Sequence, residues 1–165
     1  MLIASDTEMQ VVIFRPPLVY GLGVKGNFAA LMKFVQQGIP LPFGAINNKR
    51  SLVSLNNLVD LTITCIDHPK VTNQVFLAGD ELDLSIADLL QSLAKATMVL
   101  SRLIPVSDSV LIFTLNLLGK KAFAQRLFGS LQVDVSKARE LLGCTPLLSV
   151  EKGLCRCFVR NAEQY

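Results

Sequence analysis

The sequence contains 165 residues, close to the length of about 150 that is typical of one domain, so we expect one domain rather than two. Hydrophobic residues make up 51% of the chain and charged residues 18%, a composition that excludes an intrinsically disordered protein. The net charge of +3 is too small to predict a nucleic-acid partner.

The most apolar region covers residues 103–118 and is interrupted by Pro105, Asp108 and Asn116. A membrane-spanning helix needs about 20 mostly uncharged residues, so we predict no membrane span and interpret this region as buried or partner-facing. The N-terminus lacks the basic start and long apolar core of a signal peptide. The four cysteines are few and unevenly spaced in apolar surroundings, which is typical of free buried thiols. We therefore expect a cytoplasmic chain.

The first part of the chain reads as strand, loop and helix. Residues 11–14 form a β-branched and aromatic run, which predicts a strand buried on both faces of a parallel sheet and ending at residues 15–17. Residues 2–9 resemble the last turns of a helix that leads into this strand. Gly21, Gly23 and Gly26 predict a flexible loop, and Asn27 is expected to cap a helix that ends at Gly38.

The middle of the chain predicts two further strands and two helices. Residues 41–44 read as a turn, and the alternation in residues 51–55 predicts a half-exposed strand. Asn56 and Asn57 precede a helix that ends near residue 67, and residues 74–78 predict another strand. Ser85 and Asp88 resemble a capping box, which opens a helix with one apolar face: Ile86, Leu89, Leu90 and Leu93.

The last third of the chain is mostly helical in pattern. Residues 110–118 are apolar nearly all round and predict a helix, whereas Val133 lies in a short extended piece. Ser136 is expected to cap a helix that ends at Leu142, and Ser149 is expected to cap a final helix.

Residues 21–26, GLGVKG, match the G-x-G-x-x-G motif of dinucleotide-binding loops. Pro16 and Pro17 interrupt the strand before the loop, and no acidic residue follows about 20 residues later to hold a ribose. The helix is also followed by residues 40–42, PLP, instead of a second parallel strand. We therefore interpret the loop as one that needs glycine for a tight backbone path rather than as a phosphate cradle.

Candidates for acid-base chemistry or metal binding are few. His68 is the only histidine and lies in a sequence typical of a solvated helix end. Cys155 and Cys157 are spaced to lie on different faces of a helix, so we predict core packing for both rather than a zinc site.

Arg50 and Phe43 are the two side chains whose positions suit a ligand. A guanidinium between a polar turn and a strand can hold a phosphate with two parallel hydrogen bonds, or it can be a solvated strand end. Phe43 lies between Pro42 and Gly44, where its ring either stacks on a flat ligand or fills the core. Spacing alone favours the core for Phe43.

Several segments together resemble the extended short-chain dehydrogenase/reductase family of NAD-dependent nucleotide-sugar epimerases and dehydratases. These segments are RPPLVYG at residues 15–21, NF at 27–28, GIPLPFG at 38–44, RSLVSL at 50–55, VDVSKAR at 133–139 and LGCTP at 142–146. Their order and spacing follow the family over nearly the whole chain, and the resemblance covers only the family's C-terminal half. It implies an α/β fold that is the C-terminal part of a Rossmann-like fold, with one or two remaining parallel core strands and a mostly helical substrate-binding region with short strands.

The resemblance also implies what the chain lacks. The family's N-terminal half supplies the glycine-rich NAD(P) loop and a Tyr-x-x-x-Lys pair, and the segments that resemble the family in this sequence include neither. Tyr20 is followed by Lys25 at the wrong spacing and falls in the loop beside the nicotinamide, so it is not expected to be the catalytic tyrosine. We expect this chain alone to bind no cofactor and to be inactive.

Four kinds of contact carry over from the family to this sequence. Pro16 and Pro17 match the segment near the nicotinamide, and Asn27 matches a polar contact to the nucleotide-sugar. Phe43 matches the residue beside a uracil-type base, and Arg50 matches the arginine that holds the diphosphate.

Arg126 matches a second arginine that reaches the nucleotide, with looser spacing. Many family members have asparagine where this chain has Leu18, and Asn56-Asn57 replaces a common acidic pair.

The first hypothesis for function is therefore the UDP-sugar-binding portion of an epimerase, dehydratase or 4-keto reductase that makes polysaccharide sugars. The alternative is a non-catalytic binding or assembly module, or a truncated remnant without function. We also predict self-association, because the strand at residues 11–14 lacks the sheet that covers it in the family.

Overall fold

The structure of the chain is a computed structural model that describes residues 10–158, apart from the side chains of Asn27, Phe123 and Arg126. The predicted helix end at residues 2–9 lies outside the described residues. The described elements, in chain order, are β1 (Ile13–Arg15), β2 (Leu18–Tyr20), α1 (Asn27–Gln36), β3 (Leu52–Ser54), α2 (Leu55–Ile66), β4 (Val75–Leu77), α3 (Ile86–Thr97), α4 (Asp108–Leu117), α5 (Lys121–Phe128), α6 (Ser136–Leu142) and α7 (Val150–Arg156).

The strands form two parallel pairs, which confirms the α/β class with parallel strands. β1 pairs with β4, with Phe14 opposite Phe76, and β2 pairs with β3, with Val19 opposite Val53. The sequence analysis missed β2, because Pro16 and Pro17 end β1 and the extended backbone resumes directly after them. The prediction that β3 is half-exposed was wrong, since all three of its residues are buried under α2 and α7.

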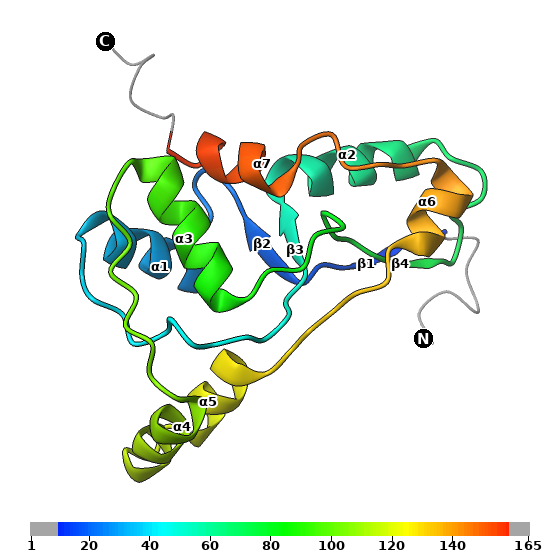
Figure 1. Cartoon of the computed structure of the whole chain (residues 1–165). Helices are drawn as coiled ribbons and strands as arrows, with labels where there is room; N and C mark the ends of the chain where they lie inside the picture. Colours follow the sequence, from blue (N-terminus) through cyan, green and yellow to red (C-terminus); the bar gives the residue numbers. More distant parts are fainter. Residues whose placement is uncertain (1–9, 159–165) are drawn as a thin grey trace.

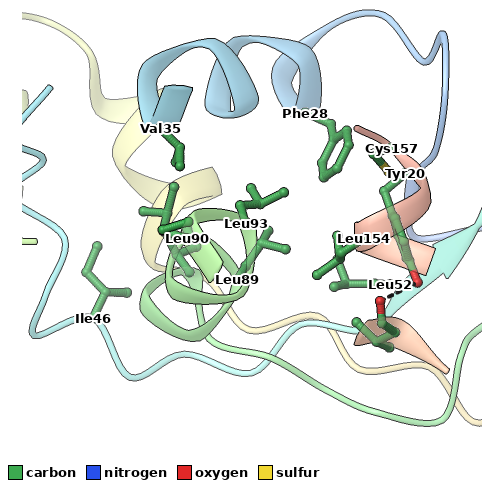
Figure 2. Packing of buried hydrophobic residues seen from close by; sticks show 13 residues of the cluster. Tyr20, Phe28, Val35, Ile46, Leu52, Leu89, Leu90, Leu93, Leu154 and Cys157 are labelled. Atoms are coloured by element: carbon green, nitrogen blue, oxygen red, sulfur yellow. Dashed lines mark hydrogen bonds between the residues drawn. The ribbon is translucent and has the colours of Figure 1, made fainter. Parts of the chain in front are cut away.

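A first core cluster lies between α1, α3, α7 and the β2–β3 pair. Figure 2 shows Phe28 of α1, Leu93 of α3 and Leu154 of α7 converging near the ring of Tyr20. The predicted apolar face of α3 is confirmed, because all four of its residues are buried. This cluster fixes the end of β2 against α7.

A second core cluster joins the β1–β4 pair to α2 and α6. Phe76 of β4 is fully buried and stacks with Phe14 of β1, with ring centroids 6.3 Å apart. The ammonium group of Lys137 on α6 lies 5.4 Å from the centroid of the Phe76 ring, a cation–π contact. In Figure 1, α6 lies beside β4, while α2 and α7 lie along the same side of the strands.

Helix caps agree with the sequence in two places and differ in three. The capping box of Ser85 and Asp88 and the Ser149 cap are confirmed. The expected caps at Asn27 and Ser136 were wrong by one residue, because Gly26 and Val135 hold those positions.

The third difference concerns α2. The helix begins at Leu55, so Asn56 and Asn57 lie within it instead of preceding it, and its cap is Ser54, whose hydroxyl accepts a hydrogen bond from the Asn57 backbone N–H. A hydroxyl at the end of a buried strand therefore starts the next helix without a linker.

Helix α4 forms where the apolar run predicted a helix, but it contributes no buried residue. It packs against α5, and the two helices lie apart from the strands at the lower edge of Figure 1. No helix in the described part of the chain is long and apolar enough to cross a membrane.

Candidate functional site

Arg50 lies where three segments of the chain meet. Its backbone N–H donates to the Leu84 carbonyl and its carbonyl accepts from the Leu84 N–H, both at 3.0 Å. On the other side, residue Leu131 bonds the neighbours of Arg50: its N–H donates to the Lys49 carbonyl at 2.9 Å, and its carbonyl accepts from the Ser51 N–H at 2.8 Å. The backbone at Arg50 is thus held from both sides.

The guanidinium group of Arg50 is also held by the chain. Its Nε donates to the Gly129 carbonyl at 3.1 Å, and its partial burial lowers the pKa of the group. Because guanidinium pKa values lie above about 12, the side chain keeps its positive charge at neutral pH. The structure therefore presents a cation in a fixed orientation beside the residues that follow α5.

Asn48 positions these residues and was not recognised in the sequence. Its buried amide donates to the carbonyls of Leu127 and Gly129 at 3.1 and 3.2 Å, and its Oδ1 accepts from the Ile86 N–H at 3.1 Å. One side chain therefore joins the end of α5 to the start of α3. Only the tertiary contacts reveal this role, because the local sequence shows a polar turn.

A second polar cluster lies next to Arg50. The Ser51 hydroxyl donates to Oδ1 of Asp83 at 2.6 Å and accepts from the Val133 N–H at 2.9 Å. The other Asp83 oxygen accepts from the Gln132 side chain. These hydrogen bonds hold residues 131–133 beside the residues that precede β3.

Phe43 precedes Arg50 on the same coil segment. Its ring is half-buried and packs against the first core cluster, as spacing alone predicted. Leu41 and Gly44 next to it bond the backbone of residues 102–104, at 2.9 and 3.0 Å. The segment that carries Phe43 is therefore anchored, with part of the ring accessible.

The other residues assigned from the resemblance lie at different places. Pro16 is exposed and Pro17 half-buried, between β1 and β2. Asn27 is the first residue of α1 and Arg126 lies in α5, but their side chains lie outside the described part of the structure. Of the assigned residues, Phe43 and Arg50 are those whose described side chains share one segment.

The glycine-rich loop connects β2 to α1. Gly23 and Gly26 adopt φ angles of 77° and 93°, which side-chain-bearing residues rarely adopt. A Cβ on Gly21 would lie 2.9 Å from Cβ of Leu55, so this glycine is needed for close packing against α2. The loop thus has the tight backbone path that the sequence analysis favoured.

Tyr20 is fully buried and belongs to a polar network around Asp80. Its hydroxyl donates to Oδ2 of Asp80 at 2.6 Å, and the Asp80 carboxylate also accepts from the Ser54 N–H and from the Asn57 amide. Burial, together with the bond to Asp80, raises the pKa of Tyr20. Tyr20 is therefore a structural residue, in line with its exclusion from acid-base chemistry.

The thiols and the histidine form no metal site in the part of the chain that the structure describes. All four cysteines are free: Cys65 and Cys157 are buried, Cys144 is half-buried and Cys155 is exposed. The prediction of core packing was therefore wrong for Cys155, which lies on the outer face of α7. His68 is half-buried at the end of α2, and its Nδ1 accepts from the Lys70 N–H at 3.3 Å.

Comparison with known proteins identifies relatives over about half of their length. No family model matches the sequence. The chain is 51% identical to the UDP-glucose 4-epimerase of Vibrio cholerae over 152 residues, which are 92% of this chain and 46% of that protein. It is 21% identical to an uncharacterized protein of Sinorhizobium fredii over 99% of this chain and 51% of that protein.

Solved structures share the fold. The UDP-N-acetylglucosamine 4-epimerase of Bacillus cereus superposes with a TM-score of 0.70 at 17% identity, over 95% of this chain and 48% of that one. The UDP-glucose 4-epimerase of Thermotoga maritima, solved with UDP-glucose, gives 0.65 at 20% identity, over 90% and 45%. The UDP-glucuronic acid 4-epimerase of B. cereus, solved with NAD, gives 0.69 at 21% identity, over 92% and 44%.

The sequence likeness, the parallel strand pairs and the shared fold agree with the motifs quoted above. The chain spans about half the length of the relatives it matches. It therefore matches the C-terminal half of an extended short-chain dehydrogenase/reductase of the nucleotide-sugar epimerase type.

Proposed function

We propose that this chain is the nucleotide-sugar-binding portion of an NAD-dependent epimerase, dehydratase or 4-keto reductase, and that its ligand is a UDP-sugar. The observation that carries the proposal is the fixed guanidinium of Arg50, held through Nε by the Gly129 carbonyl. A cation that is oriented before binding loses little freedom when it binds a diphosphate. Relatives named as UDP-sugar epimerases support this choice of ligand.

Phe43 and Arg50 have separate roles in the proposed site. The diphosphate binds Arg50, and the base lies against the accessible part of the half-buried Phe43 ring. Asn27 and Arg126 are proposed as further polar contacts to the nucleotide-sugar.

We propose that the glycine-rich loop packs against the chain rather than binding the pyrophosphate of a dinucleotide. The Cα of Gly21 faces the side chain of Leu55, and the Val24 side chain lies 3.7 Å from where a Cβ of Gly21 would be. The space on the Cβ side of this glycine is therefore filled by the chain itself. Pro16 and Pro17 are proposed to lie near the nicotinamide in an enzyme that also contains a dinucleotide-binding unit.

Calorimetric titration of the purified chain with UDP-glucose and, separately, with NADH tests the proposal. We expect UDP-glucose to bind and NADH not to bind. Replacing Arg50→Ala is expected to weaken UDP-glucose binding by roughly 1.5 to 3 kcal/mol, the usual value of a hydrogen bond to a charged group. Arg50→Lys is expected to restore only part of this loss, because an ammonium group lacks the planar fork.

Lys49→Ala is the matched control, because Lys49 is an exposed cation on the same segment and should leave the affinity unchanged. Uridine, which has no phosphate, should bind the wild type and Arg50→Ala equally. Equal UDP-glucose binding by both proteins would contradict the role of Arg50. Binding of neither ligand would favour a remnant, whereas UDP-glucose binding alone is also compatible with a non-catalytic binding module.

The setting of this activity follows from the proposed ligand. We propose that the chain acts in the cytoplasm in the synthesis of polysaccharide sugars. The four free cysteines support a reducing compartment.

A further inference from the structure

Helices α4 and α5 form a hairpin that projects from the rest of the chain (Figure 1). Gly119 follows α4 with a φ of 69°, a left-handed conformation that ends the helix and lets the chain reverse before α5. Leu111 of α4 and Leu127 of α5 pack against the first core cluster. The turn between the helices therefore lies at the free end of the hairpin.

The outer face of α4 is apolar and exposed. Val110, Phe113 and Leu117 follow one another at helical spacing and are 54%, 69% and 78% exposed, and Leu118 at the turn is 69% exposed. Thr114 on the same helix donates its hydroxyl to the carbonyls of Val110 and Leu111, at 3.0 and 2.9 Å. The Thr114 hydroxyl is therefore hydrogen-bonded within the helix and does not require water as a partner.

Positive charge lies beside this apolar face. Lys120 and Lys121 are exposed at the turn, directly after Leu117 and Leu118. The sequence contains no acidic residue between Asp108, at the start of α4, and Asp134. The free end of the hairpin thus combines large apolar side chains with uncompensated cations.

We propose that the α4–α5 hairpin docks on an anionic lipid bilayer, with Phe113, Leu117 and Leu118 inserted among the acyl chains and Lys120 and Lys121 on the lipid phosphates. Apolar side chains next to lysines are the combination that binds membrane interfaces. α4 has 10 residues and a length of about 15 Å, half of the hydrocarbon thickness of about 30 Å, so it enters one leaflet without crossing.

Charge favours a membrane over a second copy of the chain. Two hairpins packed with their turns at the same end would bring their lysine pairs together, and no acidic residue at the turn would compensate them. An anionic surface attracts the same lysines. The inserted side chains and the two lysines are not among the residues proposed to bind the sugar-nucleotide, although Arg126 of that site lies on α5.

Tryptophan fluorescence tests the insertion directly, because the sequence contains no tryptophan. Phe113→Trp supplies a single reporter on the exposed face of α4. Its emission should shift to shorter wavelength on addition of vesicles of phosphatidylcholine with one third phosphatidylglycerol. Leu147→Trp, on the connection between α6 and α7 at a side chain that is 65% exposed, should show no shift. An unshifted Phe113→Trp spectrum would overturn the proposal.

Vesicle sedimentation separates the contribution of the lysines to membrane binding from that of the apolar side chains. Each lysine near an anionic surface contributes about fivefold in affinity, so Lys120→Glu with Lys121→Glu should weaken binding at least thirtyfold. Leu117→Ser should weaken it roughly tenfold or more. Equal binding of these variants, or equal binding to vesicles of phosphatidylcholine alone, would contradict the proposal.

Light scattering without lipid tests the alternative that a second copy of the chain binds the apolar face of α4. All of the substituted side chains are exposed, and circular dichroism checks that each variant remains folded. If Leu117→Ser converts an oligomer into a monomer, a second copy of the chain covers the face and the membrane proposal is overturned.

Discussion

The hydroxyl group of Tyr20 on β2 donates a 2.6 Å hydrogen bond to the carboxylate of Asp80, which follows β4. Because β2 belongs to one strand pair and β4 to the other, this bond joins the two sheets through their side chains. The same carboxylate accepts from the Ser54 N–H at the end of β3, at 3.0 and 3.1 Å. The network therefore holds the β2–β3 pair in a fixed position relative to the β1–β4 pair. Arg50 lies just before β3 and is positioned with it.

Tyr20→Phe is expected to destabilise the chain by about 1.5 to 3 kcal/mol, because it removes a buried hydrogen bond to a charged group and keeps the ring. Urea unfolding followed by circular dichroism measures the loss. Thr62→Val is the matched control, since it removes a hydroxyl that bonds the backbone of α2 at an exposed position, and its effect should stay within about 0.5 kcal/mol. A Tyr20→Phe protein as stable as the wild type would contradict the structural role of the network.

The buried acids of the first cluster predict a loss of stability at alkaline pH. Burial raises the pKa of Cys157 from 9.0 to about 11, and burial with the bond to Asp80 raises the pKa of Tyr20 above its ordinary value. The folded chain therefore keeps protons that the unfolded chain releases, so the free energy of unfolding falls as pH rises. The contribution of Cys157 is complete below pH 9.0 and is lost as the pH approaches about 11.

Urea unfolding at several pH values between 8 and 11 measures this dependence. Cys157→Ala should flatten the decline, whereas Cys155→Ala, at an exposed thiol of the same helix, should change it much less, because burial and not the charge of Cys155 is the main cause of the raised pKa of Cys157. Cys65 adds to the decline, because burial raises its pKa too. A stability that is constant over this range would show that these groups are accessible to water.

Gly153 in α7 is predicted to be intolerant of alanine for lack of space. Alanine normally favours a helix over glycine by up to about 1 kcal/mol. At this position, however, a Cβ would lie 2.6 Å from the Tyr20 hydroxyl oxygen, so Gly153→Ala should destabilise the chain by about 1 to 3 kcal/mol.

The double variant Tyr20→Phe with Gly153→Ala checks the mechanism, because it removes the oxygen that the new methyl group meets first. Its destabilisation should be smaller than the sum of the two single changes. Additive effects would place the strain of Gly153→Ala elsewhere.

Local patterns predicted the elements whose signals are local. The Ser85–Asp88 capping box and the apolar face of α3 are formed by neighbours in the sequence, and both were predicted. The burial of β3 depends on α2 and α7, which no short window contains. The apolar α4 was expected to be buried or partner-facing. Its hydrophobicity indicates that the helix avoids water, but not whether another part of the same chain covers it.

The candidate site shows the same limit. Family motifs indicated Arg50. The residues that position it, Asn48 and Gly129, are hydrogen-bonded to each other although they lie 81 residues apart in the sequence. The side chain of Asn48 bonds two carbonyls and one N–H from distant elements. A run of polar residues in the sequence does not indicate such a role.

Asn48→Asp is expected to loosen the site without removing any group that binds the ligand. The carboxylate can still accept from the Ile86 N–H, but it faces the carbonyls of Leu127 and Gly129 with an oxygen in place of a donor. We expect a loss of about 1 to 3 kcal/mol in stability, measured by urea unfolding. Asn47→Asp at the exposed neighbouring position is the control and should change little. Wild-type stability of Asn48→Asp would show that these bonds do not hold residues 127–129.

Self-association through β1 remains the expectation for the chain on its own. Within the described residues β1 pairs with β4 alone, so its other edge has backbone groups available to a further strand. Val12 and Phe14 beside this edge are half-buried and line a groove of about 340 Å³ together with the exposed Ile66. An unpaired edge next to apolar side chains favours pairing with a second copy.

Light scattering at increasing concentration should therefore show a mass above that of one chain. Ile13→Lys places a charge on the edge strand and should shift the chain toward the monomer, because a lysine there would have to be buried on pairing. Ile63→Lys, at an exposed position of α2, adds the same charge away from the edge and should leave the mass unchanged. A wild-type chain that stays monomeric at high concentration, or an oligomer that both variants leave intact, would show that β1 is not the contact.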